Sequence, residues 1–321
     1  MAGGSGNGSG NGNGGPAAGV PVPVPLPVPG LSPENGGRRP VGLLAGWGRF
    51  PFAFVEKARA VGLPVVCVGI RGEASPELAK LVRRFHWCGA ARMGRMIRLF
   101  QRGGVERVVM AGKVHKADLL HRPWKALTLL PDWRTVRFWY LRSRRDNKDD
   151  TLLLGLIAEF AKDGLCFESA LDLCPELLVR AGTLTRRAPT PREEADIAFG
   201  WEVAKEIGRL DVGQSVAVKE RAVLAVEAIE GTDRAILRAG ELCRAGGFVV
   251  VKVAKPQQDM RFDVPTVGTS TVETLRRAGG RVLAVEAGKT IVLDRDDTVA
   301  LADRYGLTIV ALTSGANGPR P

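Results

Sequence analysis

The sequence predicts an α/β protein with a disordered tail, an N-terminal Rossmann-like domain built on a parallel sheet, and a second α/β domain. Two observations support this prediction. Short apolar runs alternate with helical patterns from residue 41 onward, and 321 residues suffice for two domains of ordinary size. We place the N-terminal domain at residues 41–182, a proline-bearing linker at 183–191 and the C-terminal α/β domain at 192–314.

The tail, residues 1–40, differs in composition from the rest of the chain. It holds 12 of the 40 glycines and 8 of the 20 prolines, in a Gly/Asn/Ser tract followed by alternating Val and Pro. Such a segment cannot bury a core and is typical of a flexible extension with a polyproline II stretch. It also lacks the basic start and apolar run of a secretory signal.

The N-terminal domain alternates strands and helices, which favours a parallel sheet covered by helices on both faces. Strands are expected at 41–46, 64–70 and 105–110, and helices around 52–58, near 76–84, near 92–101 and at 150–162.

The C-terminal domain repeats this alternation. Helices are expected at 192–210, 233–243 and 296–305, and strands at 215–219, 223–227, 248–253, 281–285, 290–293 and 307–312.

Two glycine turns of the N-terminal domain each follow a strand. The first contains Gly46 and Gly48, and the second contains Gly112 and Lys113. Backbone N–H groups at such turns can bind a phosphate or a sugar at the carboxyl edge of the sheet, although a tight turn of purely structural use is an equal alternative. The first turn lacks the third glycine of a nicotinamide fingerprint, and residues 69–71 lack the acidic ribose ligand, which disfavours an oxidoreductase.

Positive charge is concentrated in one stretch of the chain. The sequence has 46 Lys and Arg against 34 Asp and Glu, a net charge of +12, and residues 83–148 hold 17 basic and 4 acidic side chains, a net of +13. Four of the six tryptophans lie there as well. Aromatic rings among arginines suit single-stranded nucleic acid or the headgroup layer of an anionic membrane, and they also fit a helix with an aromatic core face.

Two further compositional features exclude protein classes. No uninterrupted apolar run reaches about 18 residues, so we expect no membrane-spanning helix. The five cysteines form no CxxC pair, which makes a disulfide framework or a zinc cluster improbable and favours a reducing cytosol.

Adjacent carboxylates, Asp149 and Asp150, stand at the start of the helix expected at 150–162. The helix dipole alone accounts for acidic residues there. Equally, a pair of hard oxygen ligands beside a phosphate suits Mg²⁺.

Polar residues gather at two points of the C-terminal domain. Strand 223–227 leads into a loop with Glu227, Glu230, Thr232 and Asp233, of which Thr232 can simply cap the next helix. The segment leaving strand 248–253 carries unlike charges and an amide, namely Lys252, Lys255, Gln258, Asp259, Arg261 and Asp263. A structural loop does not need this density of charge, so we expect a functional site there.

These segments resemble the LpxI-type UDP-2,3-diacylglucosamine pyrophosphatases of lipid A synthesis, and the resemblance extends from Val41 to Leu312. It rests on the strings LDVGQSVAV, VLAVEAIEGTD and KVAKPQQDMRFDVPTVG, preceded in order by GLLAGWGRFP, AGKV and KDDTLL. The tail and the bulky Trp47 and Arg49 of the first turn depart from the family pattern, and residues 116–145 match it poorly.

The resemblance implies an activity and a set of site residues. It implies that a divalent metal, usually Mg²⁺, assists water in attacking the α-phosphorus, which yields UMP and 2,3-diacylglucosamine 1-phosphate (lipid X). It assigns catalysis to Asp263 with Glu227 and Asp233, and the metal to Asp149, Asp150 and Asp263. We expect the substrate to be bound by Gly46, Gly48, Gly112, Lys113, Gln214, Thr232, Lys252, Lys255, Gln258, Arg261 and Thr266.

The combined expectation is a cytoplasmic hydrolase that associates peripherally with the cytoplasmic face of the inner membrane. Its partners are a lipid-linked UDP-sugar and the membrane surface, with no nucleic acid, and assembly into a homo-oligomer is left open. The alternative is a non-catalytic protein that binds single-stranded nucleic acid or an anionic membrane through residues 83–148.

Overall fold

A computed structural model describes residues 39–114, 130–142 and 149–313, and it describes no side chains for residues 141–152. The described residues belong to one compact unit, Gly36–Pro321. All but the last two residues of the tail expected at 1–40 lie outside this description.

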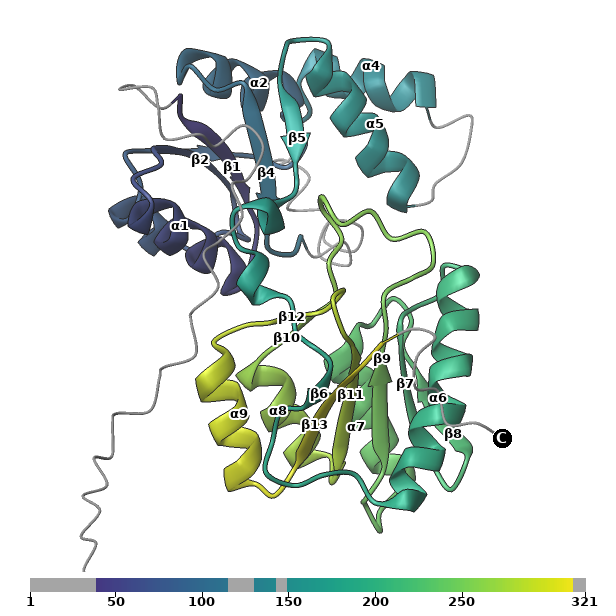
Figure 1. The fold of residues 1–321 in the computed structure, drawn as a ribbon. Helices are drawn as coiled ribbons and strands as arrows, with labels where there is room; N and C mark the ends of the chain where they lie inside the picture. Colours follow the sequence, from purple (N-terminus) through teal and green to yellow (C-terminus); the bar gives the residue numbers. More distant parts are fainter. Residues whose placement is uncertain (1–38, 115–129, 143–148, 314–321) are drawn as a thin grey trace, which may run out of the picture. The chain divides into compact units, whose positions relative to one another are not determined.

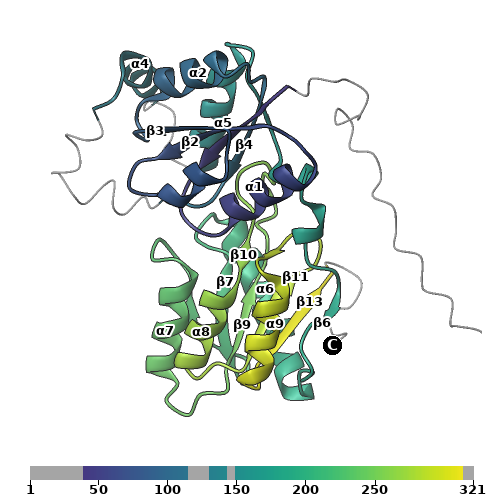
Figure 2. The same cartoon turned by 90° about the vertical axis from the view of Figure 1, so that its left-hand side faces the viewer.

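The first sheet is parallel throughout and has the strand order β3-β2-β1-β4-β5 among the described residues (Figure 1, and Figure 2 for β3). Its strands are β1 (Val41–Ala45), β2 (Val65–Ile70), β3 (Arg84–Cys88), β4 (Arg107–Ala111) and β5 (Cys166–Glu168). The order reverses between β1 and β4, as in Rossmann-type folds. The Rossmann-like parallel sheet expected from the sequence is therefore confirmed.

Helices lie on both faces of this sheet, with α1 and α2 on opposite sides (Figure 2). One face packs against α2 and α5 through Phe100 and Phe160, which share a buried cluster with Val66 and Val68 of β2. The helical elements are α1 (Phe50–Ala60), η1 (Pro76–Lys80), α2 (Met93–Arg102), α4 (Trp133–Arg142), α5 (Asp149–Ala161), η3 (Ala170–Asp172) and η4 (Pro175–Leu177).

The helix expected at 76–84 is wrong. Residues 76–80 form the short 3₁₀ helix η1, and the strand β3 begins at Arg84. The strand lies at the sheet edge and is only partly buried, so it has no continuous apolar run that would reveal it. Two features identify these residues as a strand. Apolar and polar side chains alternate, and Phe85 contacts Trp87 edge to face on one side, with 4.8 Å between the ring centroids.

The second sheet is mixed and has the order β6-β13-β11-β9-β7-β8. Strands β9, β11 and β13 are parallel, and β6, β7 and β8 pair antiparallel to their neighbours. The strands are β6 (Gly182–Thr183), β7 (Ser215–Lys219), β8 (Ala222–Val226), β9 (Val249–Lys252), β11 (Val282–Glu286) and β13 (Thr308–Leu312), and a separate parallel pair is formed by β10 (Thr266–Val267) and β12 (Ile291–Val292).

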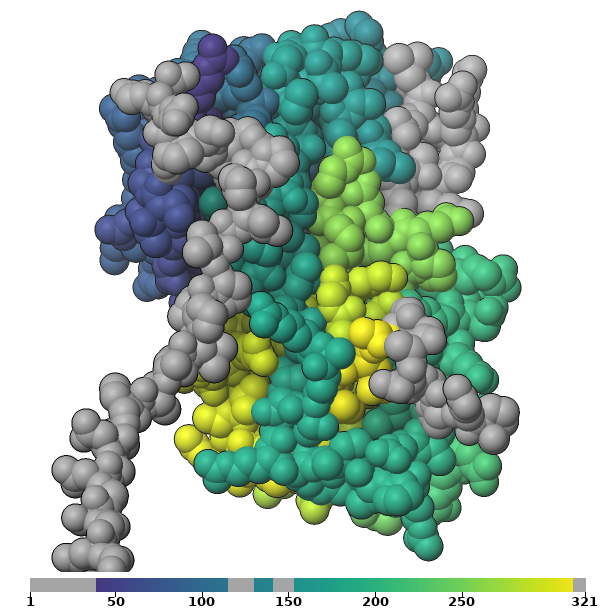
Figure 3. Space-filling view, viewed as in Figure 1, coloured from purple at the N-terminus to yellow at the C-terminus, as the bar shows by residue number. Residues whose placement is uncertain are grey.

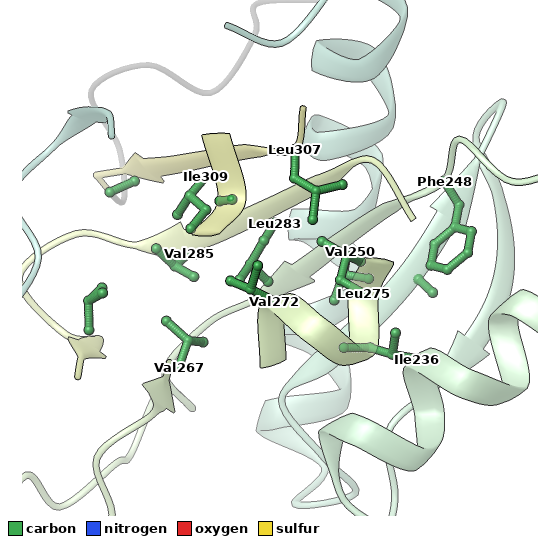
Figure 4. Close-up of a cluster of buried hydrophobic side chains, with 14 of the residues drawn as sticks. Ile236, Phe248, Val250, Val267, Val272, Leu275, Leu283, Val285, Leu307 and Ile309 are labelled. Carbon is green, nitrogen blue, oxygen red and sulfur yellow. The ribbon is translucent and has the colours of Figure 1, made fainter. Parts of the chain in front are cut away.

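Helices cover both faces of the second sheet. These are α6 (Pro191–Arg209), α7 (Thr232–Leu242), α8 (Thr269–Arg277) and α9 (Arg295–Arg304). Val249 and Val251 of β9 pack in one cluster with α6, whereas Val250 packs in the opposite cluster with Ile236 and Leu275 (Figure 4). Because side chains alternate along a strand, Lys252, two residues after Val250, points to the same side as Val250, toward α7 and α8.

None of the helices in the described ranges is long and apolar enough to cross a membrane, as the sequence predicts.

Replacing Leu283 by Ala tests the core shown in Figure 4. Leu283 is fully buried between the helices and the sheet, so Leu283→Ala should lower the free energy of unfolding by about 2–5 kcal/mol. Leu242 at the end of α7 is 64% exposed, and the same substitution there should change it by less than about 0.5 kcal/mol. Urea denaturation measures both, and equal effects would contradict this core.

Candidate active site

The candidate site lies at one edge of the second sheet, where β9 ends and β7 begins. Antiparallel pairing places Ser215 opposite Lys252, and the Glu227 amide donates to the Ser215 carbonyl at 2.9 Å. Three neighbouring strands thus bring residues that are far apart in the sequence to one place. The sequence-predicted residues Gln214, Glu227 and Lys252 meet there.

Hydrogen bonds connect three buried polar side chains at this edge. Lys252 Nζ donates to Thr232 Oγ1 at 2.9 Å, and Thr232 Oγ1 donates to Glu227 Oε1 at 2.8 Å. Lys252 also donates to the Thr266 carbonyl at 3.2 Å. A hydroxyl can accept and donate at the same time, so Thr232 joins the amine to the carboxylate. We call Lys252, Thr232 and Glu227 the buried triad.

Glycines allow the backbone to form this arrangement. Gly231 precedes α7 with φ at +85°, a conformation that other residues rarely adopt. It is the N-cap residue, and Thr232 is the first residue of the helix, so the alternative of Thr232 as a simple cap is wrong. Gly213 passes so close to β8 that a Cβ would lie 2.0 Å from the Glu227 carbonyl oxygen.

Burial lowers the pKa of Lys252, because the side chain has lost nearly all contact with water. The negative charge of Glu227 opposes this lowering of the pKa, as do Asp233 and Asp263, while Lys113 adds to it. The ammonium is therefore a stronger acid than that of a surface lysine. An arriving phosphate would favour the charged ammonium form.

Buried polar atoms at this edge lack a hydrogen-bond partner among the described residues. They include Glu227 Oε2, Gln214 Oε1 and Gln258 Nε2. The orientation of the Gln258 amide is set by its oxygen, which accepts from the Lys255 amide at 2.6 Å. Buried polar groups are nearly always paired in native proteins, so these two acceptors and one donor are the groups that a polar ligand would satisfy.

The loop after β9 carries the remaining charged residues and reaches the surface, where it appears in light green (Figure 3). Lys255 Nζ pairs with Asp211 Oδ1 at 2.5 Å, and Arg261 pairs with Asp259 at 2.6 Å. The Asp263 amide donates to the Asp259 carbonyl at 3.0 Å. Both cations therefore already have an acidic partner, which a phosphate would have to replace.

Asp233 lies apart from these buried atoms. It is exposed in the first turn of α7, immediately after Thr232. This location is compatible with a contact to a ligand that approaches from solvent.

The two glycine turns of the N-terminal domain pair with each other. Gly46 N donates to the Ala111 carbonyl at 2.9 Å, and Trp47 and Lys113 exchange backbone hydrogen bonds at 2.7 and 2.9 Å. Gly48 and Gly112 have φ values of +108° and +91°. The amides of Gly46 and Trp47 are thus used within the protein, which supports the structural alternative for them.

Metal binding would need several donor atoms close together. Within residues 39–114, 130–142 and 149–313, no three His, Cys, Asp or Glu side chains gather as a metal cluster. The side chains of Asp149 and Asp150 at the start of α5 lie outside the description. The unpartnered oxygens of Glu227 and Gln214 are nevertheless hard donors of the chemical type that Mg²⁺ prefers.

Sequence reasoning missed two residues beside the site, Lys205 and Glu286. Glu286 is fully buried at the end of β11, and its carboxylate pairs with Lys205 at 2.6 Å. A charged residue that ends an otherwise apolar strand is the signal that could have identified Glu286.

Both domains of the chain are similar to domains of one known protein family. Residues 40–177 match the LpxI N-terminal domain, and residues 180–310 match the LpxI C-terminal domain. The UDP-2,3-diacylglucosamine pyrophosphatase LpxI of Caulobacter vibrioides is 34% identical over 284 residues, which are 85% of this chain and 98% of that protein. Among solved structures, CobK precorrin-6A reductase aligns over 88% of this chain and 90% of its own, with 12% identity and a TM-score of 0.32.

The lowered pKa of Lys252 predicts how stability depends on pH. Between that pKa and the unfolded value of about 10.4, the unfolded state binds one proton more, so the free energy of unfolding rises with pH by up to about 1.4 kcal/mol per unit. Lys252→Met removes this contribution. We expect urea denaturation from pH 7 to 10.5 to show that the free energy of unfolding of the wild type, relative to that of Lys252→Met, increases as the pH rises. A difference independent of pH would show that Lys252 titrates normally.

Proposed function

The chain belongs to the LpxI family, and from this premise we propose that it hydrolyses the pyrophosphate bond of UDP-2,3-diacylglucosamine in lipid A synthesis. The products are UMP and 2,3-diacylglucosamine 1-phosphate. The observation that carries the proposal is the buried triad, which places an amine and a carboxylate with an unpartnered oxygen at one sheet edge. This pairing matches what hydrolysis of a phosphate anhydride needs.

In the proposed reaction the oxygen of water forms a bond to the α-phosphorus and the bond from this phosphorus to the bridging oxygen breaks. The bridging oxygen leaves with the lipid phosphate, and the water proton passes to a base. Negative charge builds up on the phosphate oxygens as the bond breaks. A preorganised ammonium stabilises this charge most effectively where water is excluded, which is the environment of Lys252.

Glu227 is suited to hold the attacking water. Its Oε1 is fixed by the hydroxyl of Thr232, and its Oε2 has no partner among the described residues. A carboxylate held by one oxygen can orient water and accept its proton with the other. Asp263, which matches the aspartate on which catalysis in the family depends, lies close enough for its charge to act on Lys252.

In the arrangement that the resemblance implies, a divalent cation such as Mg²⁺ would be held by Asp263, Asp149 and Asp150, and the free oxygen of Gln214 is a further hard donor for it. When bound, it would neutralise charge on the pyrophosphate oxygens. Gln258 Nε2 offers a further donor to the substrate.

Isosteric changes at the carboxylates test the proposed reaction. Glu227→Gln and Asp263→Asn should each reduce UMP release from UDP-2,3-diacylglucosamine with Mg²⁺ by about 10²-fold or more, because positioned acid–base groups contribute about that much. Glu241→Gln, on the exposed surface of α7, is the matched control and should keep full activity. Full activity of Glu227→Gln would exclude it as the base, and no release by folded wild-type protein with any divalent metal would exclude the activity.

We also propose that α4 places the enzyme at the cytoplasmic face of the inner membrane, where the lipid substrate would be found. Trp133, Val136, Arg137 and Tyr140 follow the spacing of one helical face, and Trp133 and Tyr140 are 81% and 68% exposed. Thr135 and Phe138 face inward instead. The outward rings speak against a helix whose aromatics only face the core, and rings beside arginine suit the headgroups of anionic lipids.

Arg134 has a different use from its neighbours. It forms an ion pair with Glu159 at 3.0 Å and a second with Asp163, which attach α4 to the end of α5. Reversing its charge would disturb the fold, so it is unsuitable for testing membrane binding.

The membrane proposal is tested by removing the exposed rings. Trp133→Ser with Tyr140→Ser, alone or with Arg137→Glu, should abolish co-sedimentation with phosphatidylglycerol vesicles. Ile229→Ser with Leu242→Ser, which changes residues that are 79% and 64% exposed elsewhere, should leave binding unchanged. Equal binding by all variants would refute a role of α4.

A further inference from the structure

We propose that Glu286 and Lys205 are positioning residues that hold the peptide groups of Ala254 and thereby fix where the chain enters the candidate site. The contacts do not depend on which reaction the protein catalyses, whereas their consequence for catalysis rests on the proposed function. Neither residue belongs to the motifs that indicate the site in the sequence.

The two side chains and Ala254 form a closed ring of hydrogen bonds. The Ala254 amide donates to Glu286 Oε2 at 2.8 Å, and Lys205 Nζ donates to the Ala254 carbonyl at 3.0 Å. Lys205 Nζ also donates to Glu286 Oε2 at 2.6 Å. The backbone N–H and C=O of Ala254 are therefore held by a carboxylate and an ammonium, which also form an ion pair with each other.

This ring begins where the sheet stops supporting the chain. Strand β9 ends at Lys252, and the Val253 amide still donates to the Gln214 carbonyl at 3.0 Å. On the other side, β11 ends at Glu286, whose side chain takes the place of a neighbouring strand for Ala254. Ala254 is fully buried, and buried backbone groups require such partners.

The position of Ala254 determines the position of the site residues around it. Lys252 of the buried triad lies two residues before it, and Lys255 follows it directly. The Lys255 amide in turn holds the Gln258 side chain at 2.6 Å. A shift of Ala254 would therefore move the triad amine and the Gln258 donor together.

Stability alone does not explain a charged pair here. Glu286 has no exposed surface, and Lys205 is partly covered, with its ammonium 5.7 Å from the centre of the Trp201 ring. Lys289 adds a second cation at 3.1 Å from Glu286 Oε1. Well-packed apolar residues are often as stable as a buried ion pair, whereas directional hydrogen bonds define a backbone position.

Hydrogen exchange together with kinetics tests this role in the full chain. In Lys205→Met and Glu286→Gln the amides of Ala254, Lys255 and Gln258 should exchange about tenfold faster or more, the factor expected for loss of a charge-assisted hydrogen bond. Amides of β11 should keep their protection. The kcat for UMP release should fall about tenfold with a smaller change in KM, and Lys205→Arg should restore part of it.

Glu206→Gln is the matched control, because Glu206 is the neighbouring residue on α6 and pairs only at the exposed surface with Arg209 among the described contacts. It should change neither exchange nor kcat. A uniform rise in exchange over the whole sheet with unchanged kcat would overturn the proposal, since the pair would then contribute only stability. If Glu286→Gln does not fold, the test rests on Lys205→Met, because Lys205 is the more exposed residue of the pair.

The two readouts separate this inference from the proposed function. If the wild type releases no UMP, the proposed function fails, while faster exchange confined to the amides of Ala254, Lys255 and Gln258 still supports the positioning role. If the wild type is active and the variants show neither local exchange nor a loss of kcat, the positioning role fails by itself.

Discussion

A lysine buried at the end of a central strand is the constraint on which the candidate site depends. Lys252 is 2% exposed, so its amine must find partners inside the protein. It finds them in Thr232 at the start of α7 and in the Thr266 carbonyl at the start of β10. The helix can begin there because Gly231 adopts a positive φ. One buried amine thus links a strand, a helix and the returning loop.

The polar groups around the site differ in how completely they are hydrogen-bonded. Glu286 and Lys205 are fully engaged with each other and with Ala254. By contrast, Glu227 and Gln214 each keep a buried oxygen without a partner among the described residues. A rigid support next to unsatisfied groups is the arrangement expected where a ligand completes the hydrogen bonds. This contrast separates the part of the domain that holds the chain from the part that would meet a substrate.

Much of this architecture could be predicted from the sequence, and the failures have physical reasons. Central strands such as β9 and β11 are continuous apolar runs because both of their faces are covered. The edge strand β3 and the two-residue strands β6 and β10 carry no such run, and α8 begins without a polar cap. Motifs indicated Glu227, Thr232 and Lys252, but Lys205 and Glu286 are 81 residues apart, and only the folded sheet brings them together.

A crystal structure with UMP and 2,3-diacylglucosamine 1-phosphate bound would test the central claim most directly. We expect a phosphate oxygen to lie within hydrogen-bonding distance of Lys252 Nζ, with Glu227 Oε2 facing the same phosphorus. A phosphate bound away from the edge formed by β7, β8 and β9, with Lys252 still enclosed by Thr232 and Thr266, would contradict it.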